Sequence, residues 1–426
     1  MTSLLIVACL VCGLLISLPI FVVFAATAFI TFGLTSEIPL SILPQRISAG
    51  LESFTLLAIP FFFLAAQIMS RGGLSDRLIA FVQTLVGHLP GGLGMTVVLT
   101  CMLFGSITGS SASTIVAVGT ILVPALTKSG YSPQFAIGSV TCSALIGMLI
   151  PPSNAMIIYA AVANVSIGAL FMSGIGAGLL FSFAYCAYCV GYAQIAGVPR
   201  SPRANLSQII AAAREVVWGV GMPIVILGGV YGGVFTATEA SVVAVFYAAF
   251  VGMVVYRQIN LSDLWEICID SGIASSRVLI LVAAASLFSW LMSISGTTAA
   301  MAAPLRSFSG EPSLILLATN ALLLVGGMVV DVYSNLLIMA PVILGPAGAA
   351  GINTTHLGVV MVVNVDIGNI TPPFGLNLFV AAAAFGLPYF SIVRAVLPWL
   401  AISLVCLIVI TYVPAIPMWL PERLYP

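Results

Sequence analysis

Charged side chains are scarce in this chain. Of 426 residues, 12 are Lys or Arg and 12 are Asp or Glu, and together they make up 6% of the sequence. Soluble domains carry about 25% charged residues, so this chain cannot cover its 61% hydrophobic residues with a water-facing surface. A soluble globular protein is therefore excluded. The net charge of +0 also argues against a nucleic-acid partner.

Reactive and metal-binding side chains are also few. There are two histidines, and the eight cysteines, among them Cys101, Cys142 and Cys406, lie in apolar runs without metal-ligand spacing. We interpret these cysteines as small residues of membrane helices and expect neither a disulfide nor a zinc site. The single lysine, Lys128, does not belong to a phosphate-binding loop, so an ATP-driven pump is not expected. We expect no catalytic residues and no organic cofactor.

Long apolar runs dominate the sequence instead. A membrane helix needs about 20 apolar residues, and such runs recur from Leu4 to Val413. The first 34 residues lack a positively charged start and are too long for a signal peptide, so we expect them to form the first span. The predicted spans are 3–34, 54–70, 133–163, 168–195, 217–236, 239–256, 277–300, 356–385 and 390–416.

The basic residues predict the orientation of these spans. With the N-terminus in the cytoplasm, the inside holds Arg71, Arg77, Lys128, Arg200, Arg203, Arg214, Arg257, Arg277 and Arg394, and the outside holds Arg46, Arg306 and Arg423. This split follows the positive-inside rule. This distribution of basic residues requires that residues 95–127 and residues 312–345 each enter and leave the membrane on the same side. We therefore predict two re-entrant helical hairpins that open to opposite sides, with turns near 105–113 and 326–335.

Two apolar segments carry the same Pro-Pro break. Residues 144–161 and 365–382 align at an offset of 221 positions and share a glycine and the two prolines. Together with hairpins of opposite polarity, this predicts an all-α polytopic membrane protein built as an inverted repeat. Non-helical backbone at membrane depth is tolerated only where it is buried in protein or lines a cavity. The breaks therefore predict a site between the two halves.

The breaks and the hairpin turns predict two sodium sites. A proline removes an amide donor and frees an upstream carbonyl, and uncharged oxygen donors suit sodium better than a transition metal. The candidate ligands are Gly105, Ser106, Gly109, Ser110, Gly147 and Ile150 in the first half, and Gly327, Val330, Asp331, Gly368 and Thr371 in the second. The alternative is that these small residues only let helices pack closely.

Polar residues near the same breaks predict a substrate site. Helix N-termini present free amide groups and a positive dipole end, which suit a substrate carboxylate. The candidate substrate-binding residues at helix starts are Ser153, Asn154 and Asn377, and those at the hairpin turns are Ser111, Ser334 and Asn335. The spacing places no arginine in this site, and a contribution from the span ends at Arg277 or Arg394 stays open.

Two acidic residues lie closest to the breaks. A carboxylate at membrane depth is expensive and marks a functional site by default. We assign Asp331, in the second hairpin turn, to the second sodium site, with a bond to a backbone amide as the alternative. For Asp366, a role in the site and a buried structural hydrogen bond are both open, because its counterpart in the first half is Leu145.

Amphipathic connectors complete the expected architecture. Residues 75–89 and 261–277 predict interfacial helices that brace a scaffold against a moving core, and Glu239 is predicted to cap a helix start. The expected units are 1–94 with the first scaffold spans, 95–195 with the first hairpin and broken helix, 196–311 with a cytoplasmic linker at 196–215 and the second scaffold part, and 312–426 with the second hairpin, broken helix and last span.

Several motifs, in this order along the chain, resemble one known family. The segments "FGSITGSSASTIVAVGTILVPAL", "IGMLIPPSNAMIIYA", "MVVDVYSNLLIMAPVI" and "NVDIGNITPPFGLNLFVA" look like the large membrane subunit of the tripartite ATP-independent periplasmic (TRAP) transporters. The resemblance implies a sodium-driven importer of organic acid anions, of the sialic acid or C4-dicarboxylate type. It further implies a multi-pass protein of the bacterial inner membrane that works as an elevator, with ion sites at the hairpin turns and the Pro-Pro breaks.

The same resemblance implies two protein partners besides the lipid bilayer. One is a small TRAP membrane (Q) subunit of about four spans, which we expect as a separate chain because the sequence opens directly on a large-subunit span. The other is a periplasmic substrate-binding (P) protein. The two Pro-Pro segments differ in the residue before the prolines, which is Ile150 in the first and Thr371 in the second. Equal side-chain ligation at both sodium sites is therefore not expected.

Other classes fit less well. An intramembrane aspartyl protease would need a catalytic motif around each carboxylate, and neither "MVVDVYS" nor "VNVDIGN" provides one. A channel has no need of paired broken helices that close around a solute. The remaining alternative is another sodium- or proton-coupled anion carrier with the same inverted-repeat hairpins and no binding protein.

Overall fold

The chain folds entirely into helices wherever the structure describes it. The computed structural model describes residues 2–16, 18–35, 39–306 and 311–424. Every regular element in these ranges is a helix, so the all-α prediction is confirmed. Nine of the described helices are long and apolar enough to cross a membrane, or up to ten spans if one bent helix pair is counted as a single span.

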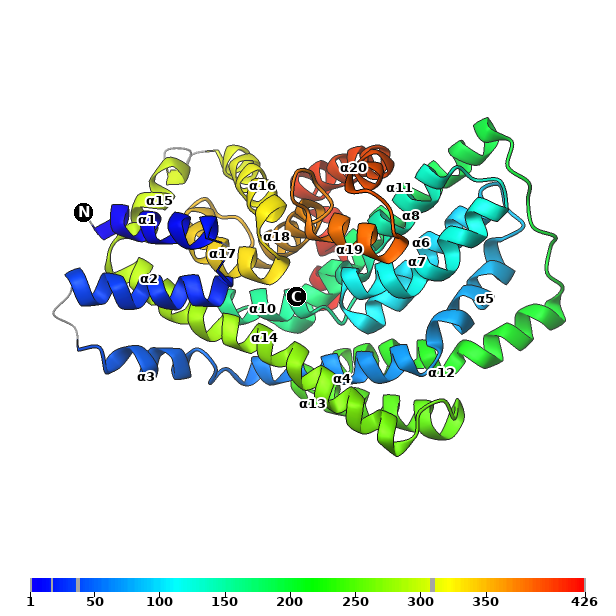
Figure 1. Ribbon diagram of the computed structural model, residues 1–426, viewed down its shortest axis with the longest axis horizontal. Coiled ribbons are helices and arrows are strands. Elements are labelled where there is room, and N and C mark those ends of the chain that lie inside the picture. The colour runs from blue at the N-terminus through cyan, green and yellow to red at the C-terminus, as the bar shows by residue number, and fades with distance from the viewer. Residues whose placement is uncertain (1, 17, 36–38, 307–310, 425–426) are drawn as a thin grey trace.

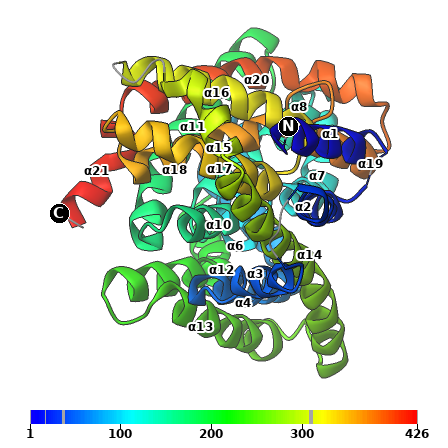
Figure 2. The ribbon, with the colours of Figure 1, turned by 90° about the vertical axis from the view of Figure 1, so that its left-hand side faces the viewer.

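The helices form two layers, and most helices of the first layer lie along the lower part of Figure 1. It is built from the N-terminal fifth and from the middle of the chain, and Figure 2 again shows α3, α4, α12 and α13 on one side of the molecule. We call this layer the scaffold. Its elements are α1 (Thr2–Leu15), α2 (Ile20–Thr35), α3 (Ile42–Ala49), the 3₁₀ turn η1 (Phe54–Leu57), α4 (Ala58–Arg71), α5 (Leu74–Val86), α12 (Leu206–Tyr231), α13 (Ala237–Phe250) with its π-helical end η2 (Val251–Val255), α14 (Leu261–Ile294) and α15 (Thr297–Arg306).

The second layer holds both hairpins and both breaks, and we call it the inner layer. Its first-half helices are α6 (Gly92–Thr108), α7 (Ser111–Lys128), α8 (Pro133–Ser143), α9 (Ile146–Leu149), α10 (Asn154–Ala163) and α11 (Ile167–Ala196). Its second-half helices are α16 (Pro312–Val329), α17 (Val332–Ala349), α18 (Thr354–Gly368), α19 (Leu376–Phe385), α20 (Tyr389–Tyr412) and α21 (Ala415–Leu424).

Capping boxes start three of the scaffold helices, α12, α13 and α14. At α13, Glu239 N–H donates to Thr236 Oγ1 at 3.2 Å, and Thr236 N–H donates to Glu239 Oε2 at 2.8 Å. This is a capping box, in which two free amide groups of the helix start are satisfied reciprocally. The prediction that Glu239 caps a helix is therefore confirmed. Equivalent boxes begin α12 and α14.

The two hairpins contact the two broken helices in the same pattern. Hairpin 1 consists of α6 and α7, and hairpin 2 of α16 and α17. Helix α6 packs on α9 and α7 on α19, while α16 packs on α18 and α17 on α10. Each hairpin therefore contacts the break of its own half with its first helix and the opposite break with its second. Figure 1 shows the hairpins on opposite sides of the middle of the molecule, as an inverted repeat requires.

Both predicted helix breaks are present. Helix α9 ends at Leu149 and α10 begins at Asn154, with a bend of 43° across the break. Helix α18 ends at Gly368 and α19 begins at Leu376. Proline has no backbone N–H, so a Pro-Pro pair cannot continue the hydrogen-bond ladder of the preceding helix. The peptide bond within each Pro-Pro pair is cis.

The prediction of one span over residues 3–34 is wrong. Helices α1 and α2 have 14 and 16 residues, lie side by side and run in opposite directions (Figure 1). A Cβ atom on Gly13 would lie 2.9 Å from Val23 Cγ1, so the two helices are in direct contact. Pro19 stands at the turn and disfavours helical backbone before it. No Lys or Arg precedes Arg46, so the reversal changes only the predicted side of the N-terminus.

Two further boundaries differ from the predictions. The expected interfacial helix 261–277 and the span 277–300 form one continuous helix, α14, of 34 residues. At 1.5 Å per residue it is about 51 Å long, which exceeds the hydrocarbon core of about 30 Å. Its charged start is stabilised by Arg71 of α4, which pairs with Glu266 and Asp270. The linker predicted at 196–215 is shorter, because α12 begins at Leu206.

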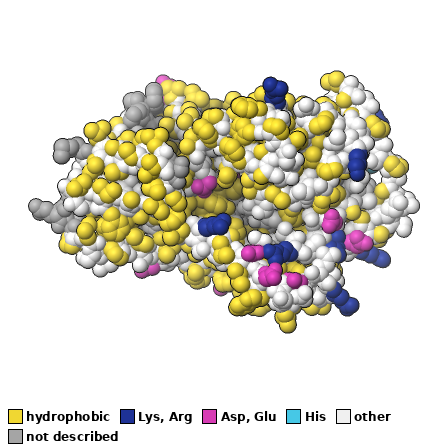
Figure 3. Space-filling model, in the orientation of Figure 1, with side chains coloured by type: hydrophobic (Ala, Val, Ile, Leu, Met, Phe, Trp, Pro, Cys, Tyr) yellow, Lys and Arg dark blue, Asp and Glu magenta, His cyan; other side chains and the backbone are white. Residues whose placement is uncertain are grey.

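Charged side chains are unevenly distributed over the surface. Figure 3 shows one half of this face covered mostly by hydrophobic side chains, whereas most charged side chains of the view lie toward the other end. A one-sided distribution of this kind is what the positive-inside rule leads us to expect. The assignment of the two ends to the two sides of a membrane stays a prediction.

Candidate ion and solute site

Hairpin 1 turns at Gly109 and Ser110. Gly109 has a φ of 59°, a left-handed conformation that glycine adopts without strain, and its N–H donates to the Gly105 carbonyl at 2.7 Å. Ser110 is extended, and its Oγ accepts the N–H of Ser113 at 3.3 Å. A serine in this position caps the following helix. Two residues are therefore enough to end α6 and to start α7.

Hairpin 2 turns at Val330 and Asp331. Val330 is extended, and Asp331 Oδ1 accepts the N–H groups of Tyr333 at 3.0 Å and Ser334 at 3.1 Å. The Ser334 hydroxyl donates to the other carboxylate oxygen. Aspartate is a strong N-cap, and its charge is favoured at the positive end of a helix dipole. Of the two roles predicted for Asp331, the structure shows the bond to backbone amides, and sodium binding stays a prediction.

Each hairpin touches the break of its own half through a pair of glycines. A Cβ atom on Gly105 would lie 2.3 Å from Gly147 Cα, and one on Gly327 would lie 3.0 Å from Gly368 Cα. No ordinary side chain fits in such a gap, so glycine is needed for this close approach of backbones. The candidate sodium ligands therefore come together as two groups, one in each half, with main-chain atoms of turn and break side by side.

The remaining candidate ligands surround these contacts. Ser106 Oγ donates to the Leu103 carbonyl and Thr371 Oγ1 to the Ile367 carbonyl, both at 2.7 Å. Each hydroxyl oxygen keeps lone pairs that can accept or ligate. Ile150 is extended directly before the first Pro-Pro pair. Within the described part of the chain, no group of three or more His, Cys, Asp or Glu could hold a metal. Main-chain, hydroxyl and amide oxygens are therefore the main donors that these sites offer to a cation.

A chain of three polar side chains joins the tip of hairpin 1 to the second break. Asp366 of α18 is fully buried, and its Oδ1 accepts the Ser111 hydroxyl at 3.3 Å. Asn377 Nδ2 donates to the same Ser111 Oγ at 2.9 Å. Ser111 is the first residue of α7, and Asn377 is the second residue of α19. Of the two roles left open for Asp366, the structure therefore shows the buried hydrogen bond.

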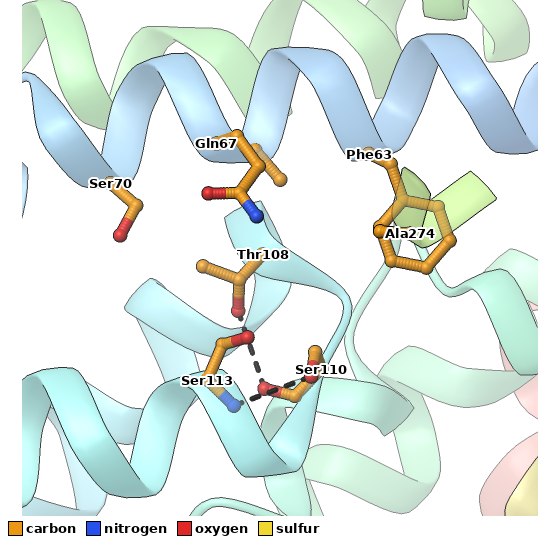
Figure 4. A pocket seen from close by; sticks show the side chains of 8 residues that line it. Phe63, Gln67, Ser70, Thr108, Ser110, Ser113 and Ala274 are labelled. Carbon is orange, nitrogen blue, oxygen red and sulfur yellow. Dashed lines mark hydrogen bonds between the residues drawn. The ribbon is translucent and has the colours of Figure 1, made fainter. Parts of the chain in front are cut away.

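A cavity of about 120 Å³ lies between hairpin 1 and the scaffold. Its lining residues come from α4, from the tip of hairpin 1 and from α14: Phe63, Ala66, Gln67, Ser70, Thr108, Ser110, Ser113 and Ala274. Figure 4 shows the Gln67 amide pointing toward Thr108, with Ser110 and Ser113 at the hairpin tip. The polar part of this lining consists of hydroxyl groups and one amide, without a charged side chain.

A second cavity of about 290 Å³ lies between the scaffold, α10 and α17. Its lining is mostly apolar and consists of Gly50, Ser53, Leu56, Ala161, Val162, Val282, Ala285, Ser286, Ser289, Leu337, Pro341 and Leu344. It meets hairpin 2 along the side of α17 and not at the tip. Because its polar groups are few, it suits a charged solute less well than the first cavity.

The predicted substrate residues are buried and lie outside the lining of the first cavity. The six residues are Ser111, Ser153, Asn154, Ser334, Asn335 and Asn377. Ser153 Oγ accepts the N–H of Met156 at 3.4 Å and so caps α10, and Asn335 Nδ2 donates to the Leu323 carbonyl at 3.0 Å. Ser153, Asn154 and Asn377 lie at the starts of α10 and α19 as predicted, and contact of the six residues with a substrate stays a prediction.

Gln67 and Ser70 line the first cavity and are not among the residues predicted from the sequence. They belong to the apolar helix α4, where Phe63, Gln67 and Ser70 follow one another at spacings of four and three residues. Residues so spaced lie on one face of a helix. Two polar residues on one face of an apolar span are therefore the signal that points to this side of the cavity.

The order of motifs along the chain corresponds to a described family. The family "Tripartite ATP-independent periplasmic transporter, DctM component" matches residues 7–416. The chain belongs to this TRAP large-permease family. The C4-dicarboxylate TRAP transporter large permease protein DctM of Pseudomonas aeruginosa is 41% identical over 373 residues, 88% of this chain and 87% of that protein. The ectoine TRAP transporter large permease protein TeaC of Halomonas elongata is 35% identical over 420 residues, 98% of each chain.

A solved structure supports the fold of this TRAP large permease. The YdaH transporter of Alcanivorax borkumensis superposes with a TM-score of 0.66 over 100% of both chains, at 17% sequence identity. At that identity the likeness concerns the fold alone. The family assignment confirms the resemblance found in the motifs, and it makes this TRAP large permease a multi-pass membrane transporter subunit and not an enzyme.

Proposed function

We propose that this TRAP large permease imports an organic acid anion across the bacterial inner membrane together with sodium. The observation that carries the proposal is the pair of glycine contacts at the hairpin tips, Gly105 with Gly147 and Gly327 with Gly368. Each contact brings the backbone of a turn against a proline-interrupted helix. Sodium is a hard cation that takes such oxygen ligands, and two equivalent groups in an inverted repeat support two coupling ions.

The cavity at hairpin 1 is the proposed solute site. Its hydroxyl groups and the Gln67 amide offer hydrogen bonds to carboxylate oxygens, and the start of α7 offers the positive end of a helix dipole. No Lys or Arg lines the cavity, so a sodium ion at the neighbouring turn would supply the opposite charge. Ser110 belongs to both sets of residues, which is an arrangement suited to binding an anion beside a cation.

The relatives suggest the class of solute. Two of them are named for a C4-dicarboxylate and for ectoine, both small solutes that carry carboxylate groups. A cavity of about 120 Å³ lies below the range of roughly 300–1,000 Å³ that is usual for drug-sized ligands. We therefore propose a small acid, first of all a C4-dicarboxylate, and keep the larger sialic acid as the second candidate.

A small membrane subunit and a periplasmic binding protein complete the proposed system, and the inner layer is proposed to move as an elevator. Two connectors join the layers at one end of the molecule, namely α5 and the segment 197–205 between α11 and α12. Ser201 N–H donates to the Gly87 carbonyl at 3.2 Å, so the connectors lie together. Connectors that lie together in this way support movement of one layer relative to the other.

Uptake by the reconstituted system tests the proposal. The chain and its small subunit are placed in liposomes, and the purified binding protein is added with radiolabelled C4-dicarboxylate. We expect saturable uptake that needs an inward sodium gradient and the binding protein, and that a potassium gradient does not support. Equal uptake under a proton gradient without sodium, or without the binding protein, would instead indicate the other class of anion carrier.

A further inference from the structure

We propose that Asp366 is a positioning residue that couples the two ion sites by holding Ser111 at the tip of hairpin 1. The proposal rests on sodium coupling as proposed above and adds how the two sites communicate. It starts from a contact over a large sequence separation. Asp366 Oδ1 accepts the hydroxyl of Ser111, 255 residues earlier in the chain, and both side chains are buried.

Ser111 is directly connected to the first ion site. It follows Gly109 and Ser110, the two residues that form the turn of hairpin 1. Fixing the Ser111 side chain therefore fixes the start of α7, and with it the turn that offers its oxygens to a cation. The link is formed by a side chain that α7 does not need for capping, because Ser110 already provides the cap.

Asp366 is directly connected to the second ion site. It lies two residues before Gly368, which packs on Gly327 of hairpin 2. Two residues span about 3 Å along a helix axis. The C-terminal end of α18 therefore contacts both hairpins, hairpin 1 through the carboxylate of Asp366 and hairpin 2 through the backbone of Gly368.

Asn377 holds Ser111 from the other side of the second break. Its Nδ2 donates to Ser111 Oγ at 2.9 Å, while its own N–H donates to the Asn369 carbonyl within the break at 3.0 Å. Ser111 is thus bonded to residues before and after the second Pro-Pro pair. A change in the geometry of that break, such as sodium binding would impose, is transmitted to the tip of hairpin 1.

The counterparts of these three residues in the inverted repeat cannot form the same link, and at the tip of hairpin 2 it is Tyr333 that bonds a residue of the first break, Asn154. At the offset of 221 positions, the counterparts of Ser111, Asp366 and Asn377 are Val332, Leu145 and Met156. All three are apolar, so the tip of hairpin 2 has no equivalent polar link to the first break through these positions. The link through Asp366 is therefore particular to one half and not a consequence of the shared architecture.

Stability does not account for a carboxylate at this place. Asp366 is 0% exposed, and its Oδ2 has no hydrogen-bond partner among the residues that the structure describes. Burial of an incompletely satisfied carboxylate is unfavourable. The equivalent position in the first half is filled by the fully buried Leu145, which shows that an apolar side chain fits this place in the fold.

The link makes the two sodium ions bind cooperatively. Sodium at the second break fixes the end of α18 and the start of α19, and these hold Ser111 in place. The turn of hairpin 1 is then already ordered when its own sodium arrives, so less conformational entropy is lost on binding. Coupling between sites is reciprocal, so sodium at hairpin 1 also strengthens binding at the second break.

Sodium titration of uptake by the reconstituted complex tests this. We expect a sigmoidal dependence for the natural protein. Asp366→Leu introduces the residue that the first half has at the equivalent position, and it removes the link. The sodium curve should then become less steep, and the half-saturating sodium concentration should rise at least about fivefold, the low end of usual coupling between sites. Asp366→Asn keeps an oxygen that accepts the Ser111 hydroxyl and should retain the steepness of the natural curve.

A matched control removes another side-chain hydrogen bond between helices of the inner layer. Tyr192→Phe deletes the hydroxyl that donates to Ser132 Oγ at 2.9 Å, between α11 and the start of α8. It should leave the steepness of the sodium curve unchanged. Ser111→Ala removes the bonds to both Asp366 and Asn377, so the double variant with Asp366→Leu should be no worse than Ser111→Ala alone.

The outcomes separate the two proposals. Uptake by the natural protein without any sodium dependence overturns the proposed function itself. If the natural curve is sigmoidal and the curve of Asp366→Leu is the same, only the coupling role is overturned. The coupling role is also overturned if Asp366→Asn loses as much steepness as Asp366→Leu does. If Asp366→Leu yields no folded complex, Ser111→Ala decides the question. Sodium-dependent thermal stabilisation of the purified complex provides the same curves without transport.

Discussion

At the tip of hairpin 1 the cap of α7 is the neutral Ser110, and at the tip of hairpin 2 the cap of α17 is the charged Asp331. The Ser110 hydroxyl accepts one long hydrogen bond, and Ser110 lines the cavity, whereas the Asp331 carboxylate accepts three hydrogen bonds from its own helix start. The two hairpins thus share a backbone arrangement but differ in the charge of the side chain at the tip. The neutral tip leaves polar groups for a solute, and the negative tip stabilises its own turn and suits a cation.

The largest expected effect comes from the glycine contacts. Gly105→Ala places a Cβ atom 2.3 Å from Gly147 Cα, whereas Gly327→Ala places one 3.0 Å from Gly368 Cα. Overpacking costs about 1–3 kcal/mol, and we expect Gly105→Ala to abolish uptake and to destabilise the protein more than Gly327→Ala does. Thermal unfolding and uptake measure both effects.

Gly191→Ala is the control for these variants. A Cβ atom there meets nothing within 4 Å, and alanine is favoured over glycine inside a helix by about 0.5–1 kcal/mol. Natural or slightly raised stability is therefore expected. If Gly105→Ala and Gly327→Ala reduced uptake and stability equally, the two glycine contacts would tolerate the same displacement. The predicted difference in tightness between the two halves would then be wrong.

The cap of hairpin 2 gives the next largest effect. Asp331→Ala removes three hydrogen bonds and should destabilise the protein by about 0.5–2 kcal/mol, with weakened sodium-coupled uptake and normal membrane insertion. Asp331→Asn keeps most of the cap and removes the charge. Uptake measured against sodium concentration then separates the two roles, and an unchanged sodium dependence in both variants would reject Asp331 as part of the ion site.

The cavity at hairpin 1 gives an effect on affinity alone. Gln67→Glu introduces a negative charge that faces the proposed anion, so we expect the KM for uptake to rise at least about tenfold with little change in the maximal rate. Gln67→Ala should raise the KM only a few-fold. Ser289→Ala, in the second cavity, is the matched control. A larger effect of Ser289→Ala would place the solute in the second cavity.

The smallest effect is expected at the cap of hairpin 1. Ser110→Ala removes one hydrogen bond of 3.3 Å at a partly exposed turn, so the loss of stability should be about 0.5 kcal/mol. The comparison between the tips predicts that this loss is smaller than that of Asp331→Ala. A thermal unfolding series with both variants checks the order, and the reverse order would contradict it.

Features with a local cause could be predicted from the sequence. A Pro-Pro pair interrupts a helix in any context, and the short polar turn at Gly109 and Ser110 ends one helix and starts another. For this reason both breaks and both hairpins lie where they are predicted. The capping role of Glu239 also depends only on residues within one turn of the helix.

Features that depend on tertiary contacts could not be predicted in the same way. The turn before Pro19 lies in an apolar run long enough to cross a membrane, and only the packing of α1 on α2 shows that the chain reverses there. The charged start of α14 pairs with Arg71, which is far away in the sequence. Likewise, the partner of Asp366 is a serine of the other half, and nothing near Asp366 in the sequence indicates it.

The continuous helix α14 lines both cavities. Ala274 faces the cavity at hairpin 1, and Ser286 faces the one beside α17. Twelve residues of helix separate them, about 18 Å at 1.5 Å per residue. A solute that travelled with the inner layer over that distance would exchange one set of α14 neighbours for the other while staying beside the same rigid helix, so crosslinks from the inner layer to successive positions of α14 would record how far the layer moves.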